Sequence, residues 1–337
     1  MKVLRYIYAS ALVLAVMSCE KLSSGPTTEE KTESVSLSIR PRIENVAATK
    51  VEVTDWDATL GYYPLAWNAG DQIQVVTSQQ PSRVCEYMFD GGAWNVAGEN
   101  EIEWGPYSNI HQFYGLYPQR NIVLEAIKEV NADTTYAIVS ATLPPVQSIT
   151  GYDESYDSYF MMTSVVDVVS PEGDITMPFK MFDTIVRVGL INNSSKTVKI
   201  LGMTLLSDIA MSGTYSAIIR SFDRLRVPDP NDDTSTIVEM YDLTEFLDSD
   251  GDGDISDAQE DRSFNISLDF GNDDAAREVT SAGNYQNFFV IPQEYRKFTL
   301  NLKLDVDGEE KEYSRTYDLT DPSTSPCHLH LIEVELN

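Results

Sequence analysis

Cysteine and histidine are scarce in this 337-residue sequence, which contains three of each. Cys85 and Cys327 lie far apart in the chain, so we expect isolated buried thiols rather than a disulfide framework. Cys327, His328 and His330 are residue types that hold soft metals, but without a second cluster we interpret them as strand surface or packing. Because no motif-bearing serine or cysteine accompanies the histidines, His111 included, we expect no enzyme.

Positive charge is also in short supply, since 24 lysines and arginines face 53 aspartates and glutamates and the formal net charge is -29. Such a chain is repelled by nucleic acid and by anionic surfaces, so we exclude nucleic acid as a partner. Glycosidases use a carboxylate pair as acid and base, and this chain has three adjacent or nearly adjacent pairs. These are Glu99 and Glu101, Asp153 and Glu154, and Asp273 and Asp274. In so acidic a sequence we attribute the pairs to chance.

Long apolar runs are absent beyond the first residues, so nothing after the leader is predicted to span a bilayer. The leader itself, residues 1–18, has a basic start at Lys2 and Arg5 and an apolar stretch that ends just before Cys19. This pattern is typical of a bacterial lipoprotein signal peptide. We therefore expect residues 1–18 to be removed and Cys19 to carry a covalent lipid that anchors the protein. The alternative is an ordinary secretory peptide with a chance cysteine.

The polar segment 19–34 is rich in Ser, Thr, Glu, Lys, Gly and Pro and is expected to be a flexible tether. Two strand-rich blocks follow, 35–173 and 174–337, divided at the turn cluster Ser170–Gly173. Alternation of apolar and polar residues predicts the first strand at Val35, Leu37 and Ile39.

Further strands of the first block are expected where β-branched or aromatic runs are bounded by turn residues. They are Val51–Val53, Gln72–Val76, Arg83–Phe89, Tyr114–Tyr117, Tyr136–Leu143 and Phe160–Thr163. One segment departs from this pattern, because apolar residues of Asn121–Asn131 fall on one face of a helix and predict a short amphipathic one. Four tryptophans, Trp56, Trp67, Trp94 and Trp104, are expected to fill the core, with a surface ligand platform as the alternative.

The second block reads as strands throughout, with Asp307-Gly308 as a strong hairpin signal. The expected strands are Ile185–Asn192, Thr197–Leu206, Gly213–Ile219, Ser263–Phe270, Phe288–Ile291, Thr299–Val306, Lys311–Leu319 and His328–Leu336.

Several phrases, in this order after the leader, resemble the fimbrillin-like family of surface lipoproteins, also called type V pilins. They include LAWNAGDQIQVV at Leu65–Val76, HQFYGLYP at His111–Pro118 and PFKMFDTIVRVGLINNSS at Pro178–Ser195. The resemblance implies an all-β fold of two tandem β-sandwich domains of transthyretin-like topology. It also implies an outer-membrane location, and subunits that assemble with themselves or with other fimbrial subunits by donating a strand into a neighbour's groove.

In the resembled family, a trypsin-like protease cuts after an arginine that follows the first strand. Pro41 hinders cleavage after Arg40, so Arg42 before Ile43 is the expected processing site. The candidate donor strand is the end of the chain, where Ile332, Val334 and Leu336 alternate with acidic residues. That stretch is equally suited to its own sheet.

An acidic insertion at 248–260 has the spacing of a calcium-binding loop. Asp248, Asp250 and Asp252 take positions one, three and five, and Gly253 takes the position of the sharp turn. Gln259 stands where the usual bidentate glutamate would be, so that ligand is missing unless Asp257 or Glu260 takes its place. Asp254, Gln259 and Glu260 complete the set of candidate ligands for a structural Ca²⁺. The alternative is a solvated acidic loop.

Taken together, these patterns favour a lipid-anchored structural or adhesive fimbrial subunit. The alternative is a non-polymerising surface lipoprotein that binds a host or glycan ligand. A tyrosine-rich loop with Tyr152, Tyr156 and Tyr159 has the composition of a sugar site, although we favour a polar loop packed on a sheet.

Overall fold

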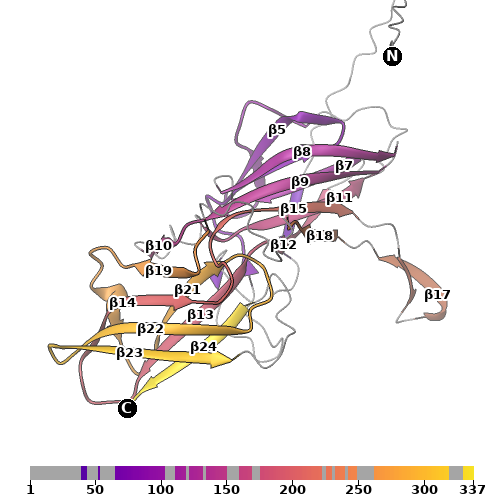
Figure 1. Cartoon of the computed structure of the whole chain (residues 1–337). Coiled ribbons are helices and arrows are strands. Elements are labelled where there is room, and N and C mark those ends of the chain that lie inside the picture. The colour runs from indigo at the N-terminus through magenta and orange to yellow at the C-terminus, as the bar shows by residue number, and fades with distance from the viewer. Residues whose placement is uncertain are drawn as a thin grey trace, which may run out of the picture. The chain divides into compact units, whose positions relative to one another are not determined.

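The computed structural model consists mainly of β-strands (Figure 1). It describes residues 39–43, 52–53, 65–102, 111–118, 121–131, 134–149, 159–168, 175–221, 225–229, 232–239, 242–248, 262–318 and 329–337. Within these residues no helix is both long and apolar enough to cross a membrane. The all-β expectation is confirmed, with most strand pairs antiparallel.

In the described part of the chain the largest sheet has seven strands, and its only parallel pair joins β1 to β12 at one edge. In order across the sheet they are β1 (Ile39–Ile43), β12 (Ile175–Met181), β11 (Met162–Val168), β7 (His111–Tyr117), β4 (Gln72–Thr77), β5 (Gln80–Phe89) and β6 (Trp94–Val96).

A four-stranded antiparallel sheet shares a hydrophobic cluster with the largest sheet. Its strands in order are β18 (Asp242–Phe246), β15 (Gly213–Ser221), β9 (Thr134–Leu143) and β8 (Ile122–Asn131). This first cluster contains buried side chains from both sheets, among them Ile73, Phe113, Val139, Phe179 and Tyr215. Alternating residues of each strand therefore supply one apolar layer between two sheets.

Two other sheets enclose a second cluster, which includes Val188, Leu205, Leu268, Phe288 and Leu302. One sheet runs β10 (Val146–Ser148), β19 (Asn265–Asp269), β14 (Val198–Leu206), β22 (Lys297–Val306) and β23 (Glu309–Asp318), with β20 (Glu278–Val279) also paired to β14. The other runs β21 (Asn284–Val290), β13 (Thr184–Asn192) and β24 (Leu329–Leu336).

Three short elements complete the described part. They are the strand pair β2 (Glu52–Val53) and β3 (Leu65–Ala66), the pair β16 (Leu225–Asp229) and β17 (Asp232–Glu239), and the 3₁₀ helix η1 (Ala275–Arg277).

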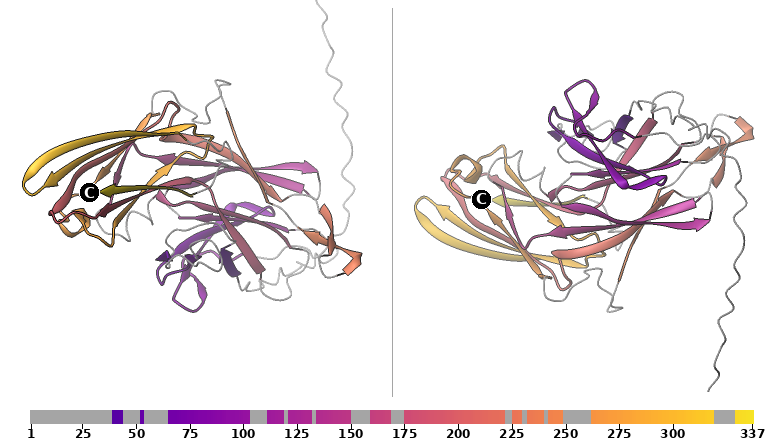
Figure 2. Two further views of the ribbon diagram at one scale, coloured as in Figure 1. Left: turned by 90° about the horizontal axis from the view of Figure 1, so that it is seen from below. Right: turned by 90° about the horizontal axis from the view of Figure 1, so that it is seen from above.

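Strand pairing crosses residue 173 in both directions (Figure 2). From the second half of the chain, β12 joins the seven-stranded sheet and β15 pairs with β9. From the first half, β10 pairs in parallel with β19. The first cluster therefore contains residues from both sides of residue 173. The predicted boundary Ser170–Gly173 lies outside the described residues and stays a prediction.

A buried glutamine connects these two halves of the sequence. Gln147 of β10 donates from Nε2 to the Phe289 carbonyl at 2.7 Å, and its Oε1 accepts from the Phe289 N–H at 3.0 Å. Its side chain thus pairs with the backbone of β21 as a neighbouring strand would.

The predicted helix at Asn121–Asn131 is wrong, because the segment forms β8 and pairs antiparallel with β9. Register shifts between Leu124 and Ala126, and between Glu129 and Asn131, interrupt the strand. Such a bulge moves the inward face by one residue, so Ile122 and Ile127 both contact the first cluster. The bulged strand therefore has apolar spacings that resemble those of a helix.

The hairpin prediction is confirmed at Asp307-Gly308, which joins β22 to β23. Both turn residues have positive φ, 54° for Asp307 and 87° for Gly308, as a tight two-residue hairpin requires. Trp67 and Trp94 pack against the first cluster with ring centroids 5.0 Å apart. Trp56 and Trp104 lie outside the described residues.

Candidate functional site

The candidate site is the edge of the seven-stranded sheet, where β1 lies in parallel beside β12. The register places Arg40 opposite Thr176 and Arg42 opposite Pro178. The predicted processing residue Arg42 is thus the fourth of the five residues of β1, and cleavage after it would remove all of the strand except Ile43. Pro178 has no N–H to donate, which is tolerated near a sheet edge.

The strand next to this edge, β12, contributes several buried side chains to the first cluster. Met177, Phe179 and Met181 of β12 are each at most 3 % exposed and face the same side of the sheet. Gly115 of β7 permits their close approach, because a Cβ there would lie 2.6 Å from Phe179 Cζ. Any strand that replaced β1 would therefore pair with a β12 backbone already fixed by packing.

The candidate donor residues lie in β24, which forms the edge of the three-stranded sheet and pairs in parallel with β13. Ile332 is buried in the second cluster, whereas Val334 and Leu336 pack against it and are partly exposed. Glu333 accepts a hydrogen bond from the Tyr285 hydroxyl at 3.4 Å. In this state the strand belongs to its own sheet.

The candidate calcium ligands are not brought together by the described residues. Asp248 is exposed just after β18, and Asp250, Asp252, Asp254, Gln259 and Glu260 lie outside the described residues. Across the described ranges no group of three or more His, Cys, Asp or Glu side chains could hold a metal ion. The calcium site stays a prediction.

The remaining predicted residues divide between packing and the undescribed segments. Cys85 is a buried thiol in the first cluster, as expected. Tyr159 packs its ring 5.9 Å from that of Phe289 and accepts a hydrogen bond from the Ser148 N–H. Lipidation at Cys19 falls outside the described residues, as do Tyr152, Tyr156, Cys327 and His328.

One electrostatically unusual group borders the first cluster. Asp183, between β12 and β13, has no exposed surface, and its Oδ1 accepts from the Met161 N–H at 3.4 Å. Its Oδ2 has no hydrogen-bond partner. Burial raises the pKa of this carboxyl well above its ordinary value, against the opposing effect of the Met161 hydrogen bond. Among the described residues, no charged side chain contributes to this shift.

Sequence reasoning missed a cavity of about 380 Å³ beside the second cluster. One side of it is formed by Lys311, Tyr313, Arg315 and Tyr317, which alternate along β23. Their spacing of two residues is visible in the sequence and indicates that the four side chains share one face of a strand. The hairpin register was needed to show that they face the cluster.

No protein-family model and no curated protein matches this sequence. Among solved structures, a Bacteroides ovatus "putative cell adhesion protein" is similar with a TM-score of 0.49 and 11% identity, over 90% of this chain and 92% of that chain. A Bacteroides uniformis protein of the same description has a TM-score of 0.44 and 13% identity, over 89% and 93%. A third, from Bacteroides fragilis, has a TM-score of 0.43 and 10% identity, over 89% and 91%.

Proposed function

We propose that this protein is a lipid-anchored subunit of the bacterial cell surface, structural or adhesive, that assembles by exchange of an edge strand. It is not proposed to be an enzyme. The fimbrillin-like sequence phrases and the leader that ends at Cys19 support this proposal. In this proposal, the first and second hydrophobic clusters are the cores of two β-sandwich domains of transthyretin-like topology.

The observation that carries the proposal is the position of β1. It is an edge strand, it is short, and it contains Arg42. Loss of β1 would leave the outer backbone groups of β12 unpaired beside a packed apolar layer. An extended strand from another subunit restores those hydrogen bonds, which is the usual mode of β-strand addition.

The donor in this proposal is β24 of a neighbouring subunit, through Ile332, Val334 and Leu336. Its release from β13 would expose the backbone of Thr184–Asn192 and part of the second cluster. A donor must therefore gain at least as much in the new groove as it loses in its own sheet. Other fimbrial subunits with a freer terminal strand are the alternative donors.

The test is digestion of the folded protein with an arginine-specific protease. We expect cleavage after Arg42, release of the segment that ends there, and oligomers that resist mild detergent. Mass spectrometry identifies the cut, and native electrophoresis identifies the oligomers.

Two matched variants control this experiment. Arg42→Ala should remain uncut and monomeric, whereas Arg40→Ala should be processed like the parent because Pro41 already hinders cleavage after residue 40. Processing and assembly of Arg42→Ala as before would remove this residue from the proposal.

A second function is favoured by the pairing of β24 within its own sheet. A subunit that keeps its terminal strand has none to donate, and a surface lipoprotein that binds a host or glycan ligand needs none. A cut protein that stays monomeric would support this function. Ca²⁺ would in either case stiffen the 248–260 insertion rather than take part in binding.

A further inference from the structure

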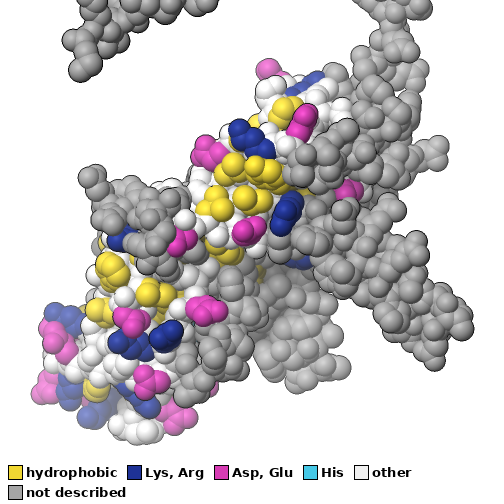
Figure 3. Space-filling model, turned by 45° about the vertical axis from the view of Figure 1, so that its right-hand side comes forward, with side chains coloured by type: hydrophobic (Ala, Val, Ile, Leu, Met, Phe, Trp, Pro, Cys, Tyr) yellow, Lys and Arg dark blue, Asp and Glu magenta, His cyan; other side chains and the backbone are white. Residues whose placement is uncertain are grey.

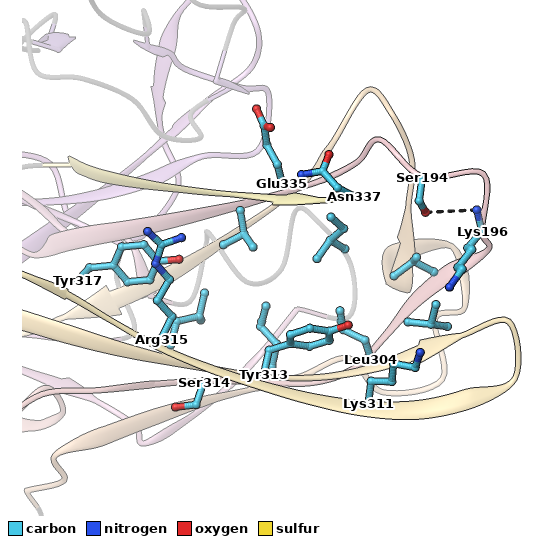
Figure 4. Close-up of a pocket in the computed structure, with 16 residues that line it drawn as sticks. Ser194, Lys196, Leu304, Lys311, Tyr313, Ser314, Arg315, Tyr317, Glu335 and Asn337 are labelled. Carbon is cyan, nitrogen blue, oxygen red and sulfur yellow. Dashed lines mark hydrogen bonds between the residues drawn. The ribbon is translucent and has the colours of Figure 1, made fainter.

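The cavity beside the second cluster lies between two sheet edges (Figure 4). One wall is β24, which pairs with β13, and the other is β23, which pairs with β22. In the described part of the chain no strand pairs with the outer edge of either. Its volume of about 380 Å³ falls in the range of ligand sites, about 300–1,000 Å³. We call this cavity the β23–β24 groove.

The floor of the β23–β24 groove is aliphatic, with its β22 side chains buried and its β24 side chains partly exposed. Leu300, Leu302 and Leu304 of β22 line it from one sheet. Val334 and Leu336 of β24 line it from the other, and both remain partly exposed although they pack on the second cluster.

The wall on β23 departs from the apolar pattern of its neighbour. The hairpin register pairs Leu304 with Lys311, Leu302 with Tyr313, and Leu300 with Arg315, so all of these side chains share one face of the sheet. On β22 that face is buried and apolar, whereas on β23 it alternates cations with tyrosines. Tyr313 is 45% exposed.

The groove carries positive charge in a chain of net charge -29. Its cations are Lys196, Lys311 and Arg315, and its single acidic side chain is Glu335. In Figure 4 Glu335 points away from the β23 side chains. By contrast, acidic and basic side chains are interspersed on the nearby outer surface (Figure 3).

Two local contacts hold the cations at the groove. Lys311 Nζ lies 3.7 Å from Glu309 Oε2, an exposed ion pair that leaves much of its charge available. The Arg315 guanidinium carbon lies 5.0 Å from the centre of the Tyr317 ring. Stacking on this ring places Arg315 without neutralising it.

We propose that the β23–β24 groove binds an extended partner strand in which acidic side chains alternate with apolar ones. Backbone groups of the strand pair with the open edge of β24 or β23. Its carboxylates all lie on one face of the strand, which points into the groove toward Lys311 and Arg315, and its apolar side chains lie on the opposite face. This site is separate from the β1 edge and does not depend on strand exchange there.

The alternative role of Lys311 and Arg315 is protective. Inward-pointing charges on an edge strand prevent sheets from joining edge to edge. Inward-pointing cations of this kind disfavour pairing with an apolar strand but attract an acidic one. Binding of an acidic peptide therefore distinguishes a binding role of Lys311 and Arg315 from a purely protective one.

The test measures binding of a capped peptide of four Val-Glu repeats to the full mature protein by calorimetry. We expect binding that weakens as salt is raised, and no binding of a capped peptide of four Val-Lys repeats. Hydrogen exchange should show protection of β24 or β23. Replacing alternate valines of the Val-Glu peptide with proline should abolish binding, because proline lacks the N–H that strand pairing needs.

The variant pair is Lys311→Gln with Arg315→Gln, which should weaken Val-Glu binding about tenfold, because two lost exposed ion pairs together contribute about 1.4 kcal/mol. Lys303→Gln is the matched control, because Lys303 lies on the same hairpin but pairs with Glu310 at 2.6 Å outside the groove. Its affinity for the peptide should be unchanged. Melting curves of all variants verify folding, and Lys196→Gln provides an independent loss of one groove cation.

Three results would overturn the proposal. The first is absence of Val-Glu binding at millimolar peptide, which leaves Lys311 and Arg315 as edge guards. The second is equal affinity for Val-Glu and Val-Lys peptides. The third is binding of polygalacturonate, lost in the double variant, without binding of the peptide, which would make the groove a site for acidic glycans.

Discussion

Among the described residues, Asp183 is a carboxyl whose pKa is raised well above its ordinary value. A carboxylate with no exposed surface and one 3.4 Å hydrogen bond is strongly disfavoured by desolvation, so its pKa is raised and the protonated form is stabilised. The folded state then holds a proton that the unfolded state has lost. The contribution of Asp183 to stability is full below about pH 3.9, its unfolded pKa, and is lost as the pH rises toward the folded pKa.

Asp183→Asn should therefore raise the melting temperature at pH 7, because the amide is neutral at every pH. The gain should shrink as the pH is lowered toward 4, since protonation then removes the penalty from the parent protein. Melting curves across this pH range measure the difference. A variant less stable than the parent at pH 7 would show that an ionised Asp183 is stabilised by contacts of its own.

A second prediction concerns the side chain of Gln147. Gln147→Leu should lower the free energy of unfolding by about 2–4 kcal/mol, because it leaves the buried N–H and C=O of Phe289 without their side-chain partner. Denaturant unfolding measures the loss. The exposed Gln79→Leu is the matched control and should change stability by less than about 0.5 kcal/mol.

Among the elements, the strands that alternate without interruption were predictable and the irregular ones were not. Thr299–Val306 alternates strictly and forms β22 as expected. β8 contains two register shifts, and its burial pattern follows the bulges rather than a period of two. A helix was the wrong interpretation because the bulge is fixed by pairing with β9, a contact that periodicity does not contain.

The acidic loop after β18 is an element whose function can be tested directly. If Ca²⁺ binds at Asp248 and Asp252, it should stabilise the protein by about 2.7 kcal/mol at a concentration one hundred times its dissociation constant. Replacing both residues with asparagine should remove this stabilisation. Identical melting in chelator and in calcium up to millimolar concentration would identify a solvated acidic loop instead.

For the whole molecule, the sequence predicted an all-β fold and the positions of many strands, but not which strands pair with each other. The domain boundary at Ser170–Gly173 was predicted from local turn signals alone and stays a prediction. Pairing of β15 with β9, and of β10 with β19, depends on long-range packing that no local pattern records. The same limitation hid the β23–β24 groove, because its two walls are brought together by the second cluster.

The parallel edge pair of β13 and β24 has a consequence for how the chain acquires its structure. β13 ends at Asn192 and β24 begins at Leu329, with strands β14 to β23 between them, so this sheet is completed only when β24 has been synthesised and pairs back with β13. Such non-local closure carries a large entropic cost before contacts compensate for it, and it slows folding. Until β24 pairs with β13, the second cluster is uncovered on one side, and the incompletely folded chain is prone to aggregation.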